Sequence, residues 1–287
     1  MEVKITDDFD LKKIVDSGQC FRPCEKVFGD DKFFRFITAE NVLYIRQTSE
    51  DSYEISCSAD DWTRIWIPYF DLETNYGDIR RIITRKTSSQ FITDAVEFGR
   101  GIRILRQDHL EMLISYIISQ QKNIPSIRKT VEKISEKYGT QIETQFETIF
   151  LFPTLDQLSA TSADDLKSMS LGYRVPYILD AVKKLTSEIE TENEIEKIFP
   201  IDLENLETYP DSKLLETLRR INGVGEKVSN CVALYSYHRM NCVPIDTWMK
   251  KALTQDLDKM DLKKVFGDYA GIAQQYIFYF KRGDKNG

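Results

Sequence analysis

The sequence feature that most constrains the fold is a stretch that is apolar almost all the way round a helix. Residues 110–118 read LEMLISYII. A helix with a single apolar stripe lies on a surface, whereas a helix that is apolar on nearly all sides is surrounded by other elements. This stretch therefore predicts a central buried helix within a helical bundle.

The N-terminal part of the chain has a different pattern. Short apolar runs at 33–37, 42–45 and 53–57 are separated by polar turn residues, which predicts a small antiparallel β region. From Asp60 onward the apolar spacing changes toward 3.6 residues, the period of a helix. At roughly 150 residues per domain, 287 residues suggest two domains. We therefore predict an α+β protein with an N-terminal α/β domain at 1–98 and a larger all-α region at 99–287.

Composition excludes several classes of protein. Apolar residues make up 41% and charged residues 30%, as in ordinary globular proteins. No run approaches the roughly 20 apolar residues of a membrane span, and the N-terminus lacks the basic and apolar regions of a secretory signal. An odd number of cysteines suits reduced thiols, so we expect a cytoplasmic protein that contacts no membrane. Without a Cys-x-x-Cys motif, and with only His109 and His238, no metal site is expected.

A glycine-containing turn between two helices is the first candidate for function. Leu214, Leu218 and Ile221 mark one helical face, NGVGEK follows at 222–227, and a second apolar helix runs to about Tyr237. Gly223 and Gly225 would allow close backbone approach, and the second helix would present N–H groups to a DNA phosphate. An ordinary tight αα turn is the alternative. Net charge is −7, but basic residues outnumber acidic ones between 219 and 251, which favours a local phosphate-binding face.

Two charged residues near this turn could carry chemistry. Lys227 stands at the start of the second helix, where partial desolvation and nearby N–H dipoles favour a neutral, nucleophilic amine. Asp246 ends the run VPID and is placed to cap a helix that begins at Thr247. Taken alone, the first is a solvated lysine and the second a helix cap.

In this combination the sequence resembles the helix-hairpin-helix DNA glycosylases with a Pro-x-Asp element, here at 211–251, and within them the 8-oxoguanine branch. The resemblance covers most of the chain. It rests on five ordered motifs: SGQCFR at 17–22, LRQD at 105–108, LGYR at 171–174, GVGEKV at 223–228 with VPID at 243–246, and AGIAQQYIF at 270–278. The four-cysteine iron–sulfur loop typical of the adenine and thymine-glycol branches is missing from the sequence.

The resemblance implies a fold, an activity and catalytic residues. The N-terminal sheet domain would resemble TATA-binding protein, and the enzyme would flip 8-oxoguanine out of duplex DNA and excise it. Lys227 would attack C1′ of the deoxyribose, giving a Schiff base that undergoes β-elimination and nicks the strand. Asp246 would stabilise the positive charge on the sugar and orient the lysine. No cofactor is implied, although the hairpin carbonyls could hold a monovalent cation, and the expected form is a monomer.

The same resemblance implies a base pocket. The carbonyl of Gly18 would accept a hydrogen bond from N7–H, which 8-oxoguanine has and guanine lacks. Cys231 and Phe278 would enclose the base, and Gln274 would bond its Watson–Crick edge. The spacing supports this on physical grounds, since Lys227 and Cys231, like Gln274 and Phe278, lie one helical turn apart. Simpler interpretations are a plain turn at Gly18 and a core cysteine at 231.

Further residues are implied to contact DNA. Tyr173 and Arg174 would wedge into the duplex and contact the base left unpaired. Gln121 replaces an asparagine of the animal enzymes, and Trp248 replaces a histidine that helps to hold a phosphate there. Two rival functions remain open: a glycosylase for alkylated bases, which would typically lack Lys227, and a non-catalytic helix-hairpin-helix protein.

The sequence predicts weak discrimination of the opposite base. Ser126 stands where the animal enzymes carry an arginine, and losing a guanidinium removes bidentate readout of cytosine. We expect similar excision rates of 8-oxoguanine opposite cytosine and opposite adenine, measured on otherwise identical duplexes. A preference for cytosine of about a hundredfold would contradict this.

Overall fold

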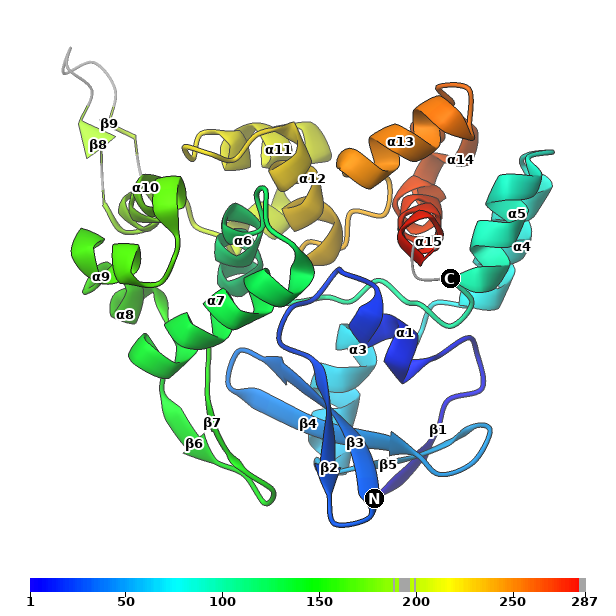
Figure 1. Cartoon of the computed structure of the whole chain (residues 1–287), viewed down its shortest axis with the longest axis horizontal. Coiled ribbons are helices and arrows are strands. Elements are labelled where there is room, and N and C mark those ends of the chain that lie inside the picture. The colour runs from blue at the N-terminus through cyan, green and yellow to red at the C-terminus, as the bar shows by residue number, and fades with distance from the viewer. Residues whose placement is uncertain (188, 191–196, 199, 284–287) are drawn as a thin grey trace. The chain divides into compact units, whose positions relative to one another are not determined.

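The computed structural model describes residues 1–187, 189–190, 197–198 and 200–283, with only the backbone described at 189–190 and 197–198. Within these ranges the chain forms a five-stranded antiparallel sheet and many helices, which confirms the predicted α+β class (Figure 1). The sheet has the strand order β1-β5-β4-β3-β2. Its strands are β1 (Glu2–Lys4), β2 (Cys24–Phe28), β3 (Asp31–Thr38), β4 (Asn41–Gln47) and β5 (Ser52–Ile55).

One face of the sheet forms an apolar core. Phe36 of β3 pairs with Leu43 of β4, Ile45 of β4 pairs with Ile55 of β5, and all four are at most 2% exposed. The same cluster of buried side chains includes three from helix α1 (Leu11–Asp16), namely Leu11, Ile14 and Val15, and four aromatic ones, namely Trp62, Trp66, Tyr69 and Phe70. The cluster explains why this short sheet is stable, since an isolated sheet of this size needs an apolar face covered by other elements.

The chain divides into two compact units. The first contains Met1–Gln107 and Leu234–Gly287, and the second contains Asp108–Ala233. This division groups segments that pack together, even where they are distant in the sequence. The predicted domain boundary between residues 98 and 99 cuts the chain once and stays a prediction. In the first unit, α15 packs against α5 and α13. Besides the sheet and α1, the helices described there are α2 (Ala59–Asp61), η1 (Trp62–Trp66), α3 (Ile67–Tyr69), α4 (Tyr76–Arg85), α5 (Gln90–Phe98), α13 (Thr247–Gln255), α14 (Leu262–Phe266), η4 (Gly267–Tyr269) and α15 (Ala270–Gly283).

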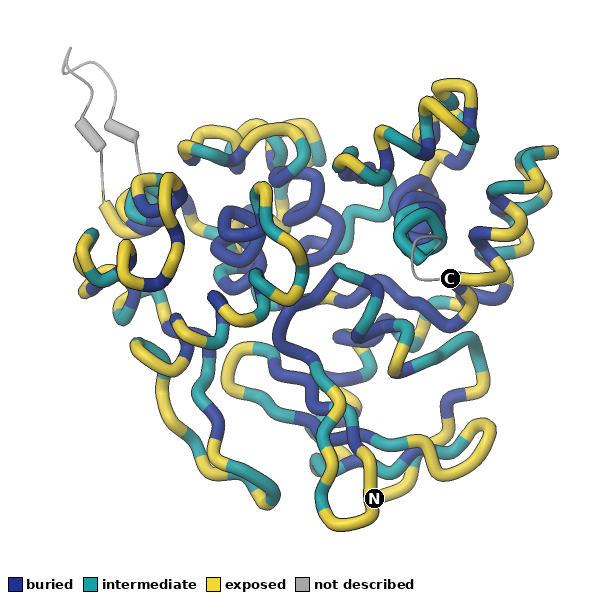
Figure 2. The backbone as a smooth tube through the Cα atoms, in the orientation of Figure 1, coloured by how far each residue is buried: buried dark blue, intermediate teal, exposed yellow. Residues whose placement is uncertain are grey.

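The second unit is built round the predicted central helix. Helix α6 (His109–Ile118) is buried at every residue except Leu110, which is half-buried, and it packs against α7 and α10 (Figure 2). The other elements described there are α7 (Ile124–Tyr138), β6 (Gln141–Glu143), β7 (Thr148–Phe150), α8 (Leu155–Ser159), α9 (Ala163–Ser168), η2 (Gly172–Arg174), α10 (Val175–Thr186), β8 (Ile189–Glu190), β9 (Lys197–Ile198), η3 (Asn205–Thr208) and α11 (Asp211–Arg219). The division between the units falls inside α12 (Glu226–Tyr235). Among the described helices, none is both long and apolar enough to cross a membrane.

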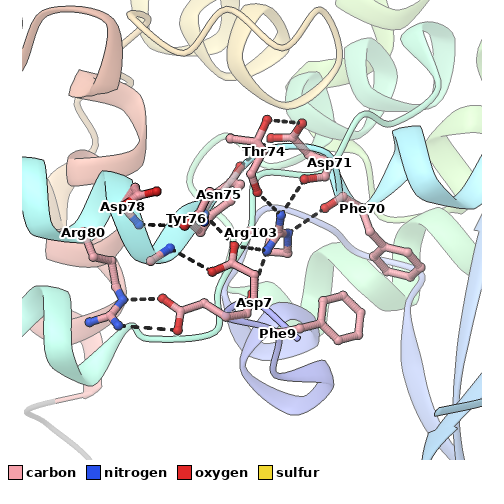
Figure 3. A network of polar contacts seen from close by, with 12 residues as sticks. Asp7, Phe9, Phe70, Asp71, Thr74, Asn75, Tyr76, Asp78, Arg80 and Arg103 are labelled. Atoms are coloured by element: carbon pink, nitrogen blue, oxygen red, sulfur yellow. Dashed lines mark hydrogen bonds and ion pairs between the residues drawn. The ribbon is translucent and has the colours of Figure 1, made fainter. Parts of the chain in front are cut away.

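A buried arginine organises the loops of the first unit (Figure 3). Arg103 is 0% exposed, and its Nε and Nη2 donate to the carbonyls of Phe70, Asp71 and Thr74 at 2.5–3.0 Å. Its Nη1 donates to the Asp7 carboxylate at 3.0 Å and to the Asp8 carbonyl at 2.8 Å. All five N–H groups of the guanidinium are therefore satisfied, as a buried charge requires.

Asp7 balances that charge. Burial by itself raises the pKa of this carboxyl, but the backbone N–H groups of Tyr76, Gly77 and Asp8, together with Arg103, hold the pKa below its usual value of 3.8. The carboxylate is therefore ionised at neutral pH and pairs with the guanidinium. Figure 3 shows the pair between the start of α4 and the loop before it.

Candidate active site

The predicted pair of helices joined by a glycine-containing turn is present. Helix α11 ends at Arg219, α12 begins at Glu226, and Gly223 in the turn has a φ of +82°. A Cβ at Gly223 would lie 2.4 Å from a ring carbon of Tyr177, so both the backbone and the space require glycine there. A Cβ at Gly225 would meet nothing within 4 Å. Gly225 is exposed, so its backbone is open to a ligand.

Helix α10 fixes the conformation of this turn. The Asp180 carboxylate accepts hydrogen bonds from the backbone N–H of Asn222 at 2.7 Å and from Lys184 Nζ at 2.9 Å. Lys184 Nζ also donates to the carbonyl of Arg220. Two side chains one turn apart on α10 thus bond two backbone groups of the turn just before Gly223, which restrains the conformation of the turn.

Lys227 and Cys231 share one face of α12, as the spacing predicts. Lys227 is half-buried, with Nζ 3.5 Å from Ser119 Oγ and 5.1 Å from the centre of the Tyr116 ring. Cys231, one turn further on, is 3% exposed. The arrangement gives an amine held by a hydroxyl and a ring face, with a buried thiol beside it on the helix.

The structure brings together three of the predicted DNA-contacting residues. Arg174 is 6% exposed, and its guanidinium donates to the carbonyls of Gln120 and Leu171 at 3.0 and 3.1 Å. Tyr173 is 46% exposed, and its ring lies 4.3 Å from the Arg174 guanidinium. Gln121 follows Gln120, whose carbonyl Arg174 bonds, and it is exposed with a φ of +50°. Tyr173 is therefore the side chain presented to solvent, while Arg174 braces the bend that exposes Gln121.

Gly18 lies in a tightly held turn of the first unit. Its φ is +85°, and both neighbours, Ser17 and Gln19, are 0% exposed. The Gln19 amide donates to the carbonyl of Arg103 at 2.8 Å and accepts from the N–H of Leu105 at 2.8 Å. Two of the motifs that were separate in the sequence, at 17–22 and 105–108, thus meet in one set of hydrogen bonds.

Two helices of the first unit carry the other predicted pocket residues. On α15, Gln274 is 3% exposed, and Phe278 is half-buried with the Arg282 guanidinium 5.4 Å from its ring centre. At the start of α13, Asp246 Oδ1 accepts from the N–H of Met249 at 2.8 Å, which confirms the predicted cap. Helices α13 and α15 pack against each other.

Trp248 follows Asp246 in the first turn of α13. It is half-buried, and Lys251 Nζ lies 5.1 Å from its ring centre. A cation therefore stands beside the Trp248 ring. Gly18, Asp246, Trp248, Gln274 and Phe278 belong to the first unit, whereas Lys227, Cys231 and the hairpin glycines belong to the second.

The cysteines and histidines do not form a metal centre in the part of the chain that the structure describes. No group of three or more His, Cys, Asp or Glu side chains that could hold a metal ion is found there. None of the five cysteines, all within the described ranges, forms a disulfide. His109 faces Glu207 at 3.4 Å, and His238 faces Asp71 at 3.3 Å.

The fold and these motifs define a DNA glycosylase of the helix-hairpin-helix class, and comparison with known proteins gives the family. Residues 2–113 match the family model for the N-terminal domain of 8-oxoguanine DNA glycosylase. The structure of MBOgg1 in complex with a low-affinity DNA ligand is 33% identical, with a TM-score of 0.88 over 99% of this chain and 96% of that one. The 8-oxoguanine glycosylase/lyase of Clostridium acetobutylicum, in complex with double-stranded DNA containing cytosine opposite 8-oxoG, is 32% identical, with a TM-score of 0.84 over 99% and 98%. The chain belongs to the 8-oxoguanine DNA glycosylase family.

Among curated proteins, the N-glycosylase/DNA lyase OGG1 of Arabidopsis thaliana is 32% identical over 195 residues. The match covers 62% of this chain and 52% of that protein. This chain therefore aligns with about half the length of the plant relative.

The two hairpin glycines should respond differently to alanine. Gly223→Ala adds a Cβ that collides with Tyr177 at a positive φ, so we expect it to lower the free energy of unfolding by about 2 kcal/mol or more. Gly225→Ala, the matched control, has open space and should change it by less than about 1 kcal/mol. Urea unfolding followed by circular dichroism checks both values. Equal losses of unfolding free energy in Gly223→Ala and Gly225→Ala would show that the contact with Tyr177 does not restrict the turn.

Proposed function

We propose that this protein excises 8-oxoguanine from duplex DNA and then nicks the strand by β-elimination through a lysine Schiff base. The observation that carries the proposal is Lys227, which follows the glycine hairpin directly and is held by Ser119 and Tyr116 in the first turn of α12. The similarity to proteins named as glycosylase/lyases supports the same activity.

The chemistry requires a nucleophile and a carboxylate. Once the nucleotide is flipped out of the helix, the Lys227 amine forms a bond to C1′ as the bond from C1′ to the base breaks. The base leaves with the bonding electrons and takes up a proton, and the lysine loses its protons as the sugar ring opens to a Schiff base. Removal of a proton from C2′ then expels the 3′ phosphate. Asp246 stabilises the positive charge that develops on the sugar, where a carboxylate is the complementary group.

Recognition of the base requires an acceptor facing N7. In this proposal the Gly18 carbonyl accepts from N7–H of 8-oxoguanine, whereas guanine would place a lone pair against that oxygen. Cys231 and Phe278 enclose the base, and Gln274 bonds its Watson–Crick edge. Gln121, Tyr173 and Arg174 act on the opposite strand. Gly223, Gly225 and Trp248 contact phosphates, which favour exposed backbone N–H groups and nearby cations.

The remaining features of the proposal concern partners and conditions. The substrate is double-stranded DNA containing 8-oxoguanine, and the protein acts on it as a monomer. We infer that no cofactor takes part, because the lysine supplies the nucleophile, and that the hairpin carbonyls can bind a monovalent cation. We also infer a cytoplasmic location, which the five cysteines outside disulfides support.

Borohydride trapping tests the nucleophile. With a duplex carrying one 8-oxoguanine opposite cytosine, we expect the native protein to form a covalent complex in the presence of sodium borohydride. Lys227→Gln should abolish the complex, because it removes the amine that forms the Schiff base. Lys213→Gln, on the preceding helix of the hairpin, is the matched control and should trap normally.

The other outcomes separate the rival functions. Trapping that survives Lys227→Gln would place the nucleophile on another residue. Excision without any trapping would favour attack by water, as in glycosylases for alkylated bases. Binding without excision would favour the non-catalytic alternative.

A second variant separates the charge of Asp246 from its role as a cap. Asparagine is as good an N-cap as aspartate, so Asp246→Asn should keep α13 and the free energy of unfolding close to native. Loss of the negative charge should lower the single-turnover excision rate by about a hundredfold. Asp261→Asn, at the equivalent cap of α14, is the control and should leave that rate unchanged. Native excision by Asp246→Asn would show that Asp246 is only a cap.

A further inference from the structure

A short chain of buried hydrogen bonds reaches the turn that holds Gly18. The hydroxyl of Tyr235, at the end of α12, donates to Gln275 Oε1 at 2.6 Å. Gln275 Nε2, on α15, donates in turn to the carbonyl of Ser17 at 3.0 Å. Tyr235 is 4% exposed, and Gln275 and Ser17 are 0% exposed. All three belong to the first unit, so these bonds form within one compact body.

These bonds fix one of the two peptide planes beside Gly18. The Ser17 carbonyl belongs to the peptide that precedes Gly18, and rotation of that plane changes the φ of the glycine. On the other side, the N–H of Gln19 faces Ser17 Oγ at 3.4 Å, and the Gln19 side chain is bonded to Arg103 and Leu105. Glycine has the widest choice of backbone conformations of any residue. Its single conformation here, with φ +85°, is therefore imposed by neighbours that hold both planes.

The Gly18 carbonyl itself is left available. In the described part of the chain, no hydrogen bond to this oxygen is found. A backbone carbonyl without a partner, in a turn whose neighbours are fully bonded, is suited to accept from a ligand.

The Ser17 carbonyl sets the orientation of the Gln275 amide, and Tyr235 holds the other end of that amide. An amide group has one acceptor and one donor end, and a flipped Gln275 would place its oxygen against the Ser17 carbonyl. Nε2 therefore faces Ser17, whose carbonyl can only accept, and the Tyr235 hydroxyl donates to Oε1 at the other end of the amide. The same hydroxyl lies 3.4 Å from Oε1 of Gln274, the residue proposed to bond the Watson–Crick edge. The Tyr235 hydroxyl therefore contacts both Gln275, which bonds the turn before Gly18, and Gln274, a predicted pocket residue.

We propose that Tyr235 and Gln275 are positioning residues that hold the Gly18 carbonyl in the direction needed to accept from N7–H of 8-oxoguanine. The proposal rests on the proposed function. Guanine and 8-oxoguanine differ there by one donor, and a hydrogen bond weakens steeply as its angle departs from linear. Selectivity for the lesion therefore depends on groups that fix the carbonyl, because its own chemistry is that of every peptide.

The experiment compares two steps of the proposed reaction that differ in their need for the base. Single-turnover excision of 8-oxoguanine opposite cytosine requires the base to be recognised, whereas β-elimination at a preformed abasic site does not. Tyr235→Phe removes one hydroxyl, and Gln275→Met keeps the size of the side chain but removes both of its hydrogen bonds. We expect each to lower the ratio of excision rate to elimination rate by about 10- to 100-fold.

Two controls make the result specific. The double variant should lower the ratio of excision rate to elimination rate no further than the more affected single variant does, because both substitutions break the same chain of hydrogen bonds. Tyr276→Phe removes a buried hydroxyl from the neighbouring position of α15, where it faces the Ile102 carbonyl at 3.5 Å, and should keep the native ratio.

The outcomes that overturn the inference are distinct from those that overturn the proposed function. If Tyr235→Phe and Gln275→Met both keep the native ratio of excision rate to elimination rate, the positioning role is wrong. The proposed excision of 8-oxoguanine is unaffected by that result. A fall of both rates in parallel with thermal stability would also overturn the positioning role, since a purely structural role predicts that pattern. A native protein that cleaves abasic sites but never releases 8-oxoguanine would overturn the proposed function and this inference with it.

Discussion

The guanidinium of Arg103 is the interaction on which the first unit depends. A buried charge is costly unless every donor is satisfied, and here four carbonyls and the Asp7 carboxylate provide the partners. The backbone of the same segment then holds the turn that contains Gly18. The Arg103 carbonyl accepts from Gln19, Leu105 donates to Gln19, and Gln107 donates to the Gln19 carbonyl. One stretch of chain thus joins the loops of the sheet domain to the neighbours of Gly18 through its side chain and its backbone.

The parts of the fold that depend on local pattern could be predicted from the sequence. Short apolar runs separated by polar turn residues predicted β3 and β4, because strands are rich in apolar and aromatic residues and end at turns. The stretch that is apolar almost all the way round a helix predicted α6, since a helix without a polar face is buried. Asp246 was predicted as a cap because capping involves residues only three positions apart. Each of these inferences needed no knowledge of distant segments.

The supports of the site could not be predicted in this way, because their partners are remote in sequence. Arg103 lies 96 residues from Asp7, and Gln275 lies 258 residues from Ser17. Periodicity shows which face of a helix is buried but not which carbonyl a buried glutamine will meet. The local pattern places Tyr235 and Gln275 in helices but does not indicate the hydrogen bonds that they form. Arg174 illustrates the same limit, since the family resemblance implies a contact with the unpaired base, and only the structure shows its guanidinium bonded to the carbonyls of Gln120 and Leu171.

In the proposed mechanism a backbone carbonyl recognises the base, and this limits how selectivity for the lesion can change. A side chain that reads a base can be replaced directly, but a carbonyl is present whatever residue occupies the position. Its direction is the variable, and the surrounding hydrogen bonds set that direction. Around Gly18 these bonds come from Gln275 on α15, from the Ser17 hydroxyl and from the segment 103–107 that Arg103 anchors. Under this proposal, substitutions that change selectivity for the lesion are therefore expected among these supporting residues.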